Sequence, residues 1–279
     1  MSVQRPALQL VHVAPEQLEV LAFLAIALGG GWSLMLVAGS GPLSLLATWI
    51  PGIAALLLTR THGAGALRRL GLRRLGWPDA YLIAIWVPVL FAVGSIAVTV
   101  ALGAGRLDDD VGGLHPASGG APVGEAVQQL VAAVTIGPIA NALVMLGPEL
   151  GWRAFLLPLL LPLGCWRAIT VTSLFWWLWQ VPLVLEPGSE RWPIEAAAFL
   201  FWCLLVGEIL GWLYLRTRSV WAPALFSGAI GATSYLPALV LRDVAPDASS
   251  PIGPAALVVP ALIVFVIRLR SQGQIHLGR

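Results

Sequence analysis

Long apolar runs dominate the pattern of hydrophobic and polar positions along the chain. A helix needs about 20 predominantly apolar residues to cross a bilayer, and somewhat fewer where the bilayer thins. Eight runs fit this requirement: residues 18–38, 43–59, 79–103, 123–146, 168–185, 194–215, 220–241 and 254–270. The pattern therefore predicts an all-α integral membrane bundle of about eight transmembrane helices, with residues 1–279 forming a single membrane domain.

Composition agrees with a multi-pass membrane protein. The chain is 58% hydrophobic and 11% charged, whereas a soluble domain carries about 25% charged residues. Its mean hydropathy is +0.85. The formal net charge of +2 gives no indication of nucleic-acid binding, so membrane lipid is the first expected partner.

The distribution of arginine predicts how the helices are oriented. All sixteen basic residues are arginine. If the N-terminus is cytoplasmic, thirteen of them fall in the cytoplasmic segments and tails, and three (Arg106, Arg191 and Arg242) fall in outer loops. This asymmetry satisfies the positive-inside rule with both termini cytoplasmic. The abundance of alanine and the absence of lysine from the sequence favour a GC-rich bacterial source, and hence a bacterial plasma membrane.

Residues 67–77 alternate between arginine and apolar side chains on the predicted cytoplasmic side. This pattern is typical of an interfacial helix that lies on anionic lipid. An ordinary positive-inside anchor is the alternative interpretation.

Residues 147–158 place charged side chains within a strongly apolar part of the chain. Gly147-Pro148 predicts the start of a helix, because proline suits the first helical position. Four residues separate Glu149 from Arg153, a spacing at which the two side chains meet on one helix face and can form an ion pair. Charges in such a setting usually mark a site. Segment 148–163 is too short to cross alone, so it either extends the fourth helix or forms a re-entrant turn.

The run Glu-Leu-Gly-Trp-Arg-Ala-Phe-Leu-Leu-Pro at 149–158 resembles the first motif of the CPBP intramembrane metalloproteases, also called the Abi or type II CAAX prenyl endopeptidase family. Residues 174–183 resemble the family's second motif, and residues 210–225 resemble the approach to its third. The resembling core block covers residues 125–235. The resemblance implies the all-helical fold of an intramembrane protease, a zinc-dependent hydrolase.

The first motif of the family opens with two adjacent glutamates, and the first is thought to activate the attacking water. Pro148 occupies that position here, so Glu149 and Arg153 are the remnant of the catalytic motif. If the chain is an active hydrolase, Glu149 is the motif residue that would have to act as the base.

The other two motifs also depart from the family. The second normally ends in histidine where this chain has Gln180, and the third pairs a histidine with asparagine or aspartate at the positions of Ser227 and Gly231. Zinc sites need three or four suitable ligands. No cofactor is expected, or zinc if the chain is active. The four histidines fall in tails or loops: His12, His62, His115 and His276.

Structural interpretations stand beside the functional ones. Glu149 and Arg153 either tie helices together or take part directly in chemistry. Gln180 either bonds between helices or binds a peptide or lipid head group, and Ser227 and Gly231 lie on a small-residue face. Glu208 has no local partner, because Arg216 lies eight residues on. Four residues are candidates for a substrate cavity: Gln180, Ser227, Gly231 and Glu208.

The sequence thus supports three functional hypotheses. The first is a pseudoenzyme (a pseudoprotease), acting as a scaffold, binding or immunity-type protein for a membrane peptide, a lipidated tail or a partner membrane protein. The second is an active endopeptidase that cleaves prenylated or membrane peptides through Glu149 and Arg153. The third is a small-solute transporter, for which the spans offer few polar groups.

Overall fold

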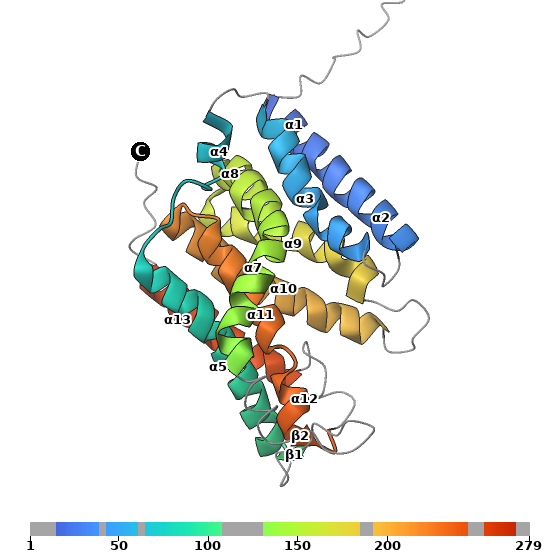
Figure 1. Ribbon diagram of the computed structural model, residues 1–279, viewed down its shortest axis with the longest axis vertical. Coiled ribbons are helices and arrows are strands. Elements are labelled where there is room, and N and C mark those ends of the chain that lie inside the picture. The colour runs from blue at the N-terminus through green and yellow to red at the C-terminus, as the bar shows by residue number, and fades with distance from the viewer. Residues whose placement is uncertain are drawn as a thin grey trace, which may run out of the picture.

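The computed structural model describes residues 15–38, 43–60, 65–107, 131–184, 192–244 and 254–271, and most of them are helical (Figure 1). Five helices in this part of the chain are long and apolar enough to cross a membrane: Glu16–Val37, Pro78–Ala101, Ile136–Leu163, Glu195–Thr217 and Trp221–Val240. The prediction of an all-α membrane bundle is confirmed.

The N-terminal part is a pair of adjacent helical rods. The first runs through α1 (Pro15–Leu24), the π-helical η1 (Ala25–Gly30) and α2 (Gly31–Ala38), and α3 (Leu43–Arg60) returns beside it (Figure 1). The apolar part of α3 is shorter than the five candidate spans.

The predicted interfacial helix at 67–77 is much shorter than expected. Helix α4 covers only Ala66–Arg69, and α5 (Pro78–Ala101) follows with proline at its start. Gly71 (φ 71°) and Gly76 (φ 79°) adopt the left-handed conformation, which glycine reaches without a steric penalty. These glycines turn the chain and end the helix that the alternating pattern predicted.

The fourth predicted helix extends further than residues 123–146, of which 123–130 lie outside the described part. Helix α7 (Ile136–Glu149) continues through the π-helical η3 (Leu150–Leu156), α8 (Leu157–Leu160) and the 3-10 turn η4 (Leu161–Leu163). Together they form one 28-residue candidate span. Of the two alternatives for segment 148–163, the structure supports the helix extension.

The remaining helices complete the bundle. They are α9 (Cys165–Val184), α10 (Trp192–Thr217), α11 (Trp221–Thr233), α12 (Leu236–Val240) and α13 (Pro254–Ser271). Helices α3, α9 and α13 occupy the three predicted runs that are not among the five candidate spans. That these three also cross the membrane stays a prediction.

A small β-ribbon joins the ends of α5 and α12. Strand β1 (Arg106–Leu107) pairs antiparallel with β2 (Leu241–Arg242), with Arg106 opposite Arg242. Arg106 Nε also lies 2.6 Å from Asp243 Oδ2 in an exposed ion pair. The ribbon gathers two arginines that the sequence assigns to outer loops.

Helices α7 and α11 pack closely at the centre of the bundle (Figure 1). A Cβ atom on Gly228 would lie 2.5 Å from both the Ala142 nitrogen and the Pro138 oxygen, so only glycine permits this approach. On the other side of the motif helix, the Phe23 and Trp152 rings meet edge-on with centroids 5.4 Å apart. The first motif is therefore enclosed between α11 and the N-terminal rods.

Candidate functional site

Two glycines fix how the motif helix faces its neighbours. A Cβ atom on Gly147 would lie 2.9 Å from Trp49 Cα, and one on Gly151 would lie 2.5 Å from Pro51 Cβ. Both therefore press against α3. Residues four apart share a helix face, and a residue midway between them points to roughly the opposite side. The glycine face thus directs Glu149 away from α3 and into the bundle.

The prediction that Gly147-Pro148 begins a helix is wrong. Pro148 lies inside α7, next to its last residue. A proline there cannot donate the hydrogen bond of the α-helical ladder. The backbone changes to the π-helical pattern at Leu150, a change of helix type that is frequent at functional sites.

Glu149 and Arg153 form the predicted ion pair. Arg153 Nε lies 3.3 Å from Glu149 Oε2, and Arg153 Nη1 donates a hydrogen bond to Oε1 at 3.4 Å. Each side chain is only 1% exposed. The pair is therefore almost completely buried inside the bundle.

Neighbouring side chains provide some, but not all, of the polar contacts that the buried ion pair can make. The Arg153 Cζ lies 4.3 Å from the ring centroid of Trp176 on α9, in a cation–π contact. Within the described part of the chain, Glu149 Oε2 and Arg153 Nη2 make no well-aligned hydrogen bond. Buried polar atoms without such partners are costly, so the pair has an incomplete set of partners.

Ser227 joins the third motif to the first. Its hydroxyl on α11 donates a hydrogen bond of 2.8 Å to Glu149 Oε1. The structure thus brings together Glu149, Arg153 and Ser227, although 78 residues separate the serine from the glutamate. Ser227 is half-buried, whereas the two charged residues are sealed.

Gln180 makes a different contact. Within the described residues its amide Nε2 donates to Cys203 Sγ on α10 at 3.6 Å, which agrees with the interhelical role considered for it. Cys203 is a buried free thiol.

Asn141 is a polar residue of the site that sequence reasoning missed. It lies on α7, where its Nδ2 donates to the Gly228 oxygen at 3.3 Å. A Cβ atom on Gly231 would lie 3.3 Å from the same nitrogen. An asparagine from α7 therefore lies next to the glycine of α11. The available signal was its position eight residues before Glu149, a spacing that recurs along one face of a helix.

Comparison with known families now identifies the block that carries these residues. Residues 125–232 match the family described as Type II CAAX prenyl endopeptidase Rce1-like. This part of the chain is therefore similar to the CAAX prenyl endopeptidases. The match includes all the motif positions discussed above, and the resemblance inferred from the motifs is confirmed. No curated protein matches the chain.

The motif residues of this chain do not fit the zinc site that the matched family implies. Zinc in proteins takes three or four ligands from cysteine, histidine, aspartate and glutamate side chains. The motif positions supply one carboxylate, Glu149, together with the side chains of Gln180 and Ser227 and the hydrogen of Gly231. Among the described residues, which include none of the four histidines, no group of three potential ligands occurs.

Glu208 lies outside the contacts that join Glu149, Arg153 and Ser227. It accepts hydrogen bonds from Nε (2.8 Å) and Nη2 of Arg268, which comes from α13. Its charge is therefore matched across two helices. Arg216, eight residues after Glu208, instead makes a cation–π contact, with its Cζ 4.8 Å from the ring centroid of Trp77.

Proposed function

We propose that this CAAX-endopeptidase family protein is a non-catalytic membrane protein, a pseudoprotease scaffold that holds a membrane peptide, lipidated tail or partner helix without cleaving it. The observation that carries the proposal is the state of Glu149. Its carboxylate is 1% exposed and is engaged by both Arg153 and Ser227.

Hydrolysis needs a base within hydrogen-bond reach of the water that it deprotonates, and such assistance contributes typically about 10² to 10⁴ in rate. Glu149 Oε1 already accepts the Ser227 hydroxyl at 2.8 Å. Pro148, which precedes it, has no side-chain base. These features favour a structural role for the ion pair over direct chemistry.

The face of α11 beyond the ion pair is a better candidate for binding. Ser227 and Asn141 are half-buried and Gly231 is exposed, so this strip can be reached from outside the bundle. Small residues let another helix approach closely, and hydroxyl and amide groups can bond to it. A partner helix or lipidated tail suits this strip by size and polarity.

The catalytic half of the proposal is tested on purified protein in mild detergent. Zinc content is measured by elemental mass spectrometry, and a farnesylated peptide is the cleavage probe. We expect zinc at background and no cleavage. Cleavage that disappears in Glu149→Gln would overturn the proposal and establish the active endopeptidase instead.

The binding half is tested with the same farnesylated peptide and its unmodified form. We expect the modified peptide to bind and to remain intact. Gly231→Leu fills the α11 strip and should weaken binding about tenfold, whereas Gly29→Leu, at a position with no atom near a Cβ, is the matched control. Equal binding by both variants would exclude the α11 strip.

A gain-of-function variant tests whether the scaffold still positions a working site. It combines Pro148→Glu, Gln180→His, Ser227→His and Gly231→Asn, with Asn141→Ala to make room beside position 231. Zinc uptake by this variant, abolished when Glu149→Gln is added, would indicate that the side chains rather than the backbone limit activity.

We also infer that the protein lies in a bacterial plasma membrane with both termini in the cytoplasm, because thirteen of its sixteen arginines then face inward. A reporter enzyme fused after Asp110, which lies outside the described residues, should be active on the external side. A cytoplasmic signal from this fusion would reverse the orientation.

A further inference from the structure

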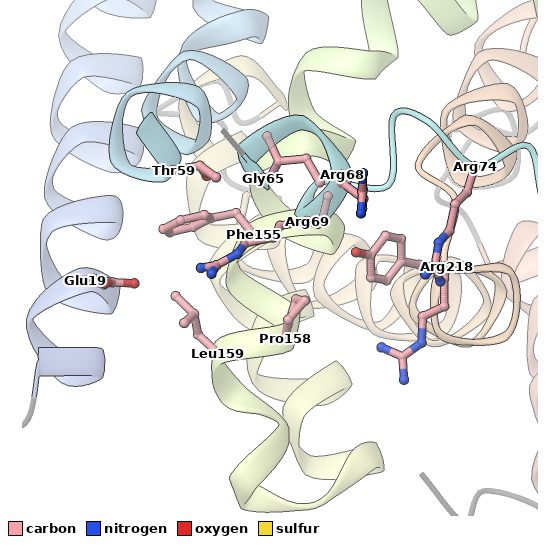
Figure 2. A pocket seen from close by; sticks show the side chains of 13 residues that line it. Glu19, Thr59, Gly65, Arg68, Arg69, Arg74, Phe155, Pro158, Leu159 and Arg218 are labelled. Carbon is pink, nitrogen blue, oxygen red and sulfur yellow. The ribbon is translucent and has the colours of Figure 1, made fainter. Parts of the chain in front are cut away.

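A basic cavity of about 600 Å³ lies at the end of the bundle where α1 begins and where α3 and α10 end. Its lining includes four arginines: Arg68, Arg69, Arg74 and Arg218. Figure 2 shows Arg68 and Arg69 coming from α4, Arg74 and Arg218 from the other side of the cavity, and Glu19 facing them from α1. We propose that this cavity binds the phosphate group of an anionic phospholipid.

The cavity is built from segments that are fixed to each other. A Cβ atom on Gly71 would lie 2.8 Å from the Arg218 oxygen, so the turn after α4 touches the turn before α11. Trp221 Nε1 on α11 donates a hydrogen bond to the Leu72 oxygen at 3.0 Å. Arg68 and Arg69 are therefore carried by a docked segment, which reduces the ordering cost of binding.

The charge of the cavity favours an anion. Four guanidinium groups stand against the single carboxylate of Glu19. Among the residues that the structure describes, no ion pair engages Arg68, Arg69, Arg74 or Arg218. Guanidinium groups match phosphate oxygens through paired hydrogen bonds, which are stronger than neutral ones.

An apolar part of the cavity lining favours a lipid over a free anion. Phe155 and Leu159, from η3 and α8, present apolar surface to the same cavity that Arg69 lines (Figure 2). The same end of the bundle carries Arg60 in the last turn of α3 and Arg216 in the last turn of α10. The sequence assigns both to the cytoplasmic side, where anionic lipids attract basic residues. A phosphate with an attached acyl chain matches both the basic and the apolar residues of the lining.

The inference is independent of cleavage and is tested by lipid binding to the full chain. The protein is purified in detergent, and retained lipid is measured by native mass spectrometry with phosphatidylglycerol, phosphatidylcholine or inorganic phosphate added. Arg69→Gln/Arg74→Gln removes two cavity charges. Arg60→Gln/Arg73→Gln removes two exposed arginines outside the cavity lining, and size-exclusion chromatography confirms that both variants fold.

We expect phosphatidylglycerol to bind at least about tenfold more tightly than phosphatidylcholine, and the cavity variant to lose about tenfold or more of that affinity. The control variant should stay within about twofold of the unchanged protein. Equal losses in both variants would reduce the effect to general surface charge and overturn the proposal. Saturable binding of inorganic phosphate with no preference among lipids would also overturn it, in favour of a soluble anion.

Discussion

Two arginine–glutamate pairs in the described part of the chain, Glu149–Arg153 and Glu208–Arg268, differ in almost every respect. Glu149 and Arg153 lie one helical turn apart, each 1% exposed, at distances of 3.3 to 3.4 Å. Glu208 and Arg268 join α10 to α13 through two hydrogen bonds, and their side chains are 12% and 46% exposed. The more enclosed pair has the poorer geometry.

The pair with the better hydrogen-bond geometry need not be the pair whose loss destabilises the protein more. A buried pair loses solvation that its mutual attraction only partly restores, yet removing one partner leaves an uncompensated charge inside the protein. A partly exposed pair gains less and loses less. The pair inside the motif is therefore weak evidence of added stability, while its integrity should matter more than that of the well-formed pair between α10 and α13.

The largest effect is expected from breaking the enclosed pair on one side only. Arg153→Met leaves Glu149 buried without its guanidinium, and we expect a loss of about 3–5 kcal/mol in the free energy of unfolding. Denaturant unfolding in mild detergent, followed by tryptophan fluorescence, measures the change.

Removing both charges together is the control for this experiment. Arg153→Met/Glu149→Leu should recover most of the loss, because apolar side chains of similar volume often replace a buried pair with little penalty. A double variant as unstable as the single one would indicate that the carboxylate has a role beyond pairing with Arg153.

The next effect concerns the glycines that hold the enclosed pair in place. Gly151→Ala would put a methyl group 2.5 Å from Pro51 Cβ and 2.7 Å from the backbone of α3. Such overpacking costs typically about 1–3 kcal/mol, and the loss should appear in the same unfolding measurement. Gly29→Ala, where no atom lies within 4 Å of the new carbon, should leave stability nearly unchanged.

The comparison also shows what the sequence could predict. Run length and composition were sufficient for an all-α membrane bundle, because a spanning helix needs a long apolar run wherever it packs. The four-residue spacing was sufficient for the Glu149–Arg153 pair, because it depends only on helix geometry. The burial of this pair could not be predicted from the four-residue spacing, because it depends on the helices packed around it.

Contacts between residues far apart in the sequence could not be predicted from local sequence patterns. The partner of Glu208 lies 60 residues along the chain, on another helix. Gly147-Pro148 has the local pattern of a helix start, but close packing on α3 keeps the helix continuous. Asn141 carries no motif, and its place beside Gly231 became visible only once α7 and α11 were packed together.

A smaller effect is expected at the hydroxyl that supports the enclosed pair. Ser227→Ala removes the 2.8 Å hydrogen bond to Glu149 Oε1, and we expect a loss of about 1–2 kcal/mol, because an ionised acceptor loses a donor. Ser234→Ala, which removes an exposed hydrogen bond to the Gly231 oxygen, should cost less than about 0.5 kcal/mol. Similar losses in both variants would show that Glu149 gains nothing particular from Ser227.

The smallest effect should come from the pair with the better geometry. Arg268→Gln removes the bidentate contact to Glu208, but nearly half of the arginine side chain is exposed. We expect a loss of at most about 1 kcal/mol in the same unfolding assay. Glu208→Gln is the partner control, and the double variant measures the coupling between them. If Arg268→Gln lowered the free energy of unfolding as much as Arg153→Met does, burial would not distinguish the two pairs. The connection between α10 and α13 would then contribute as much to stability as the enclosed charge beside α11.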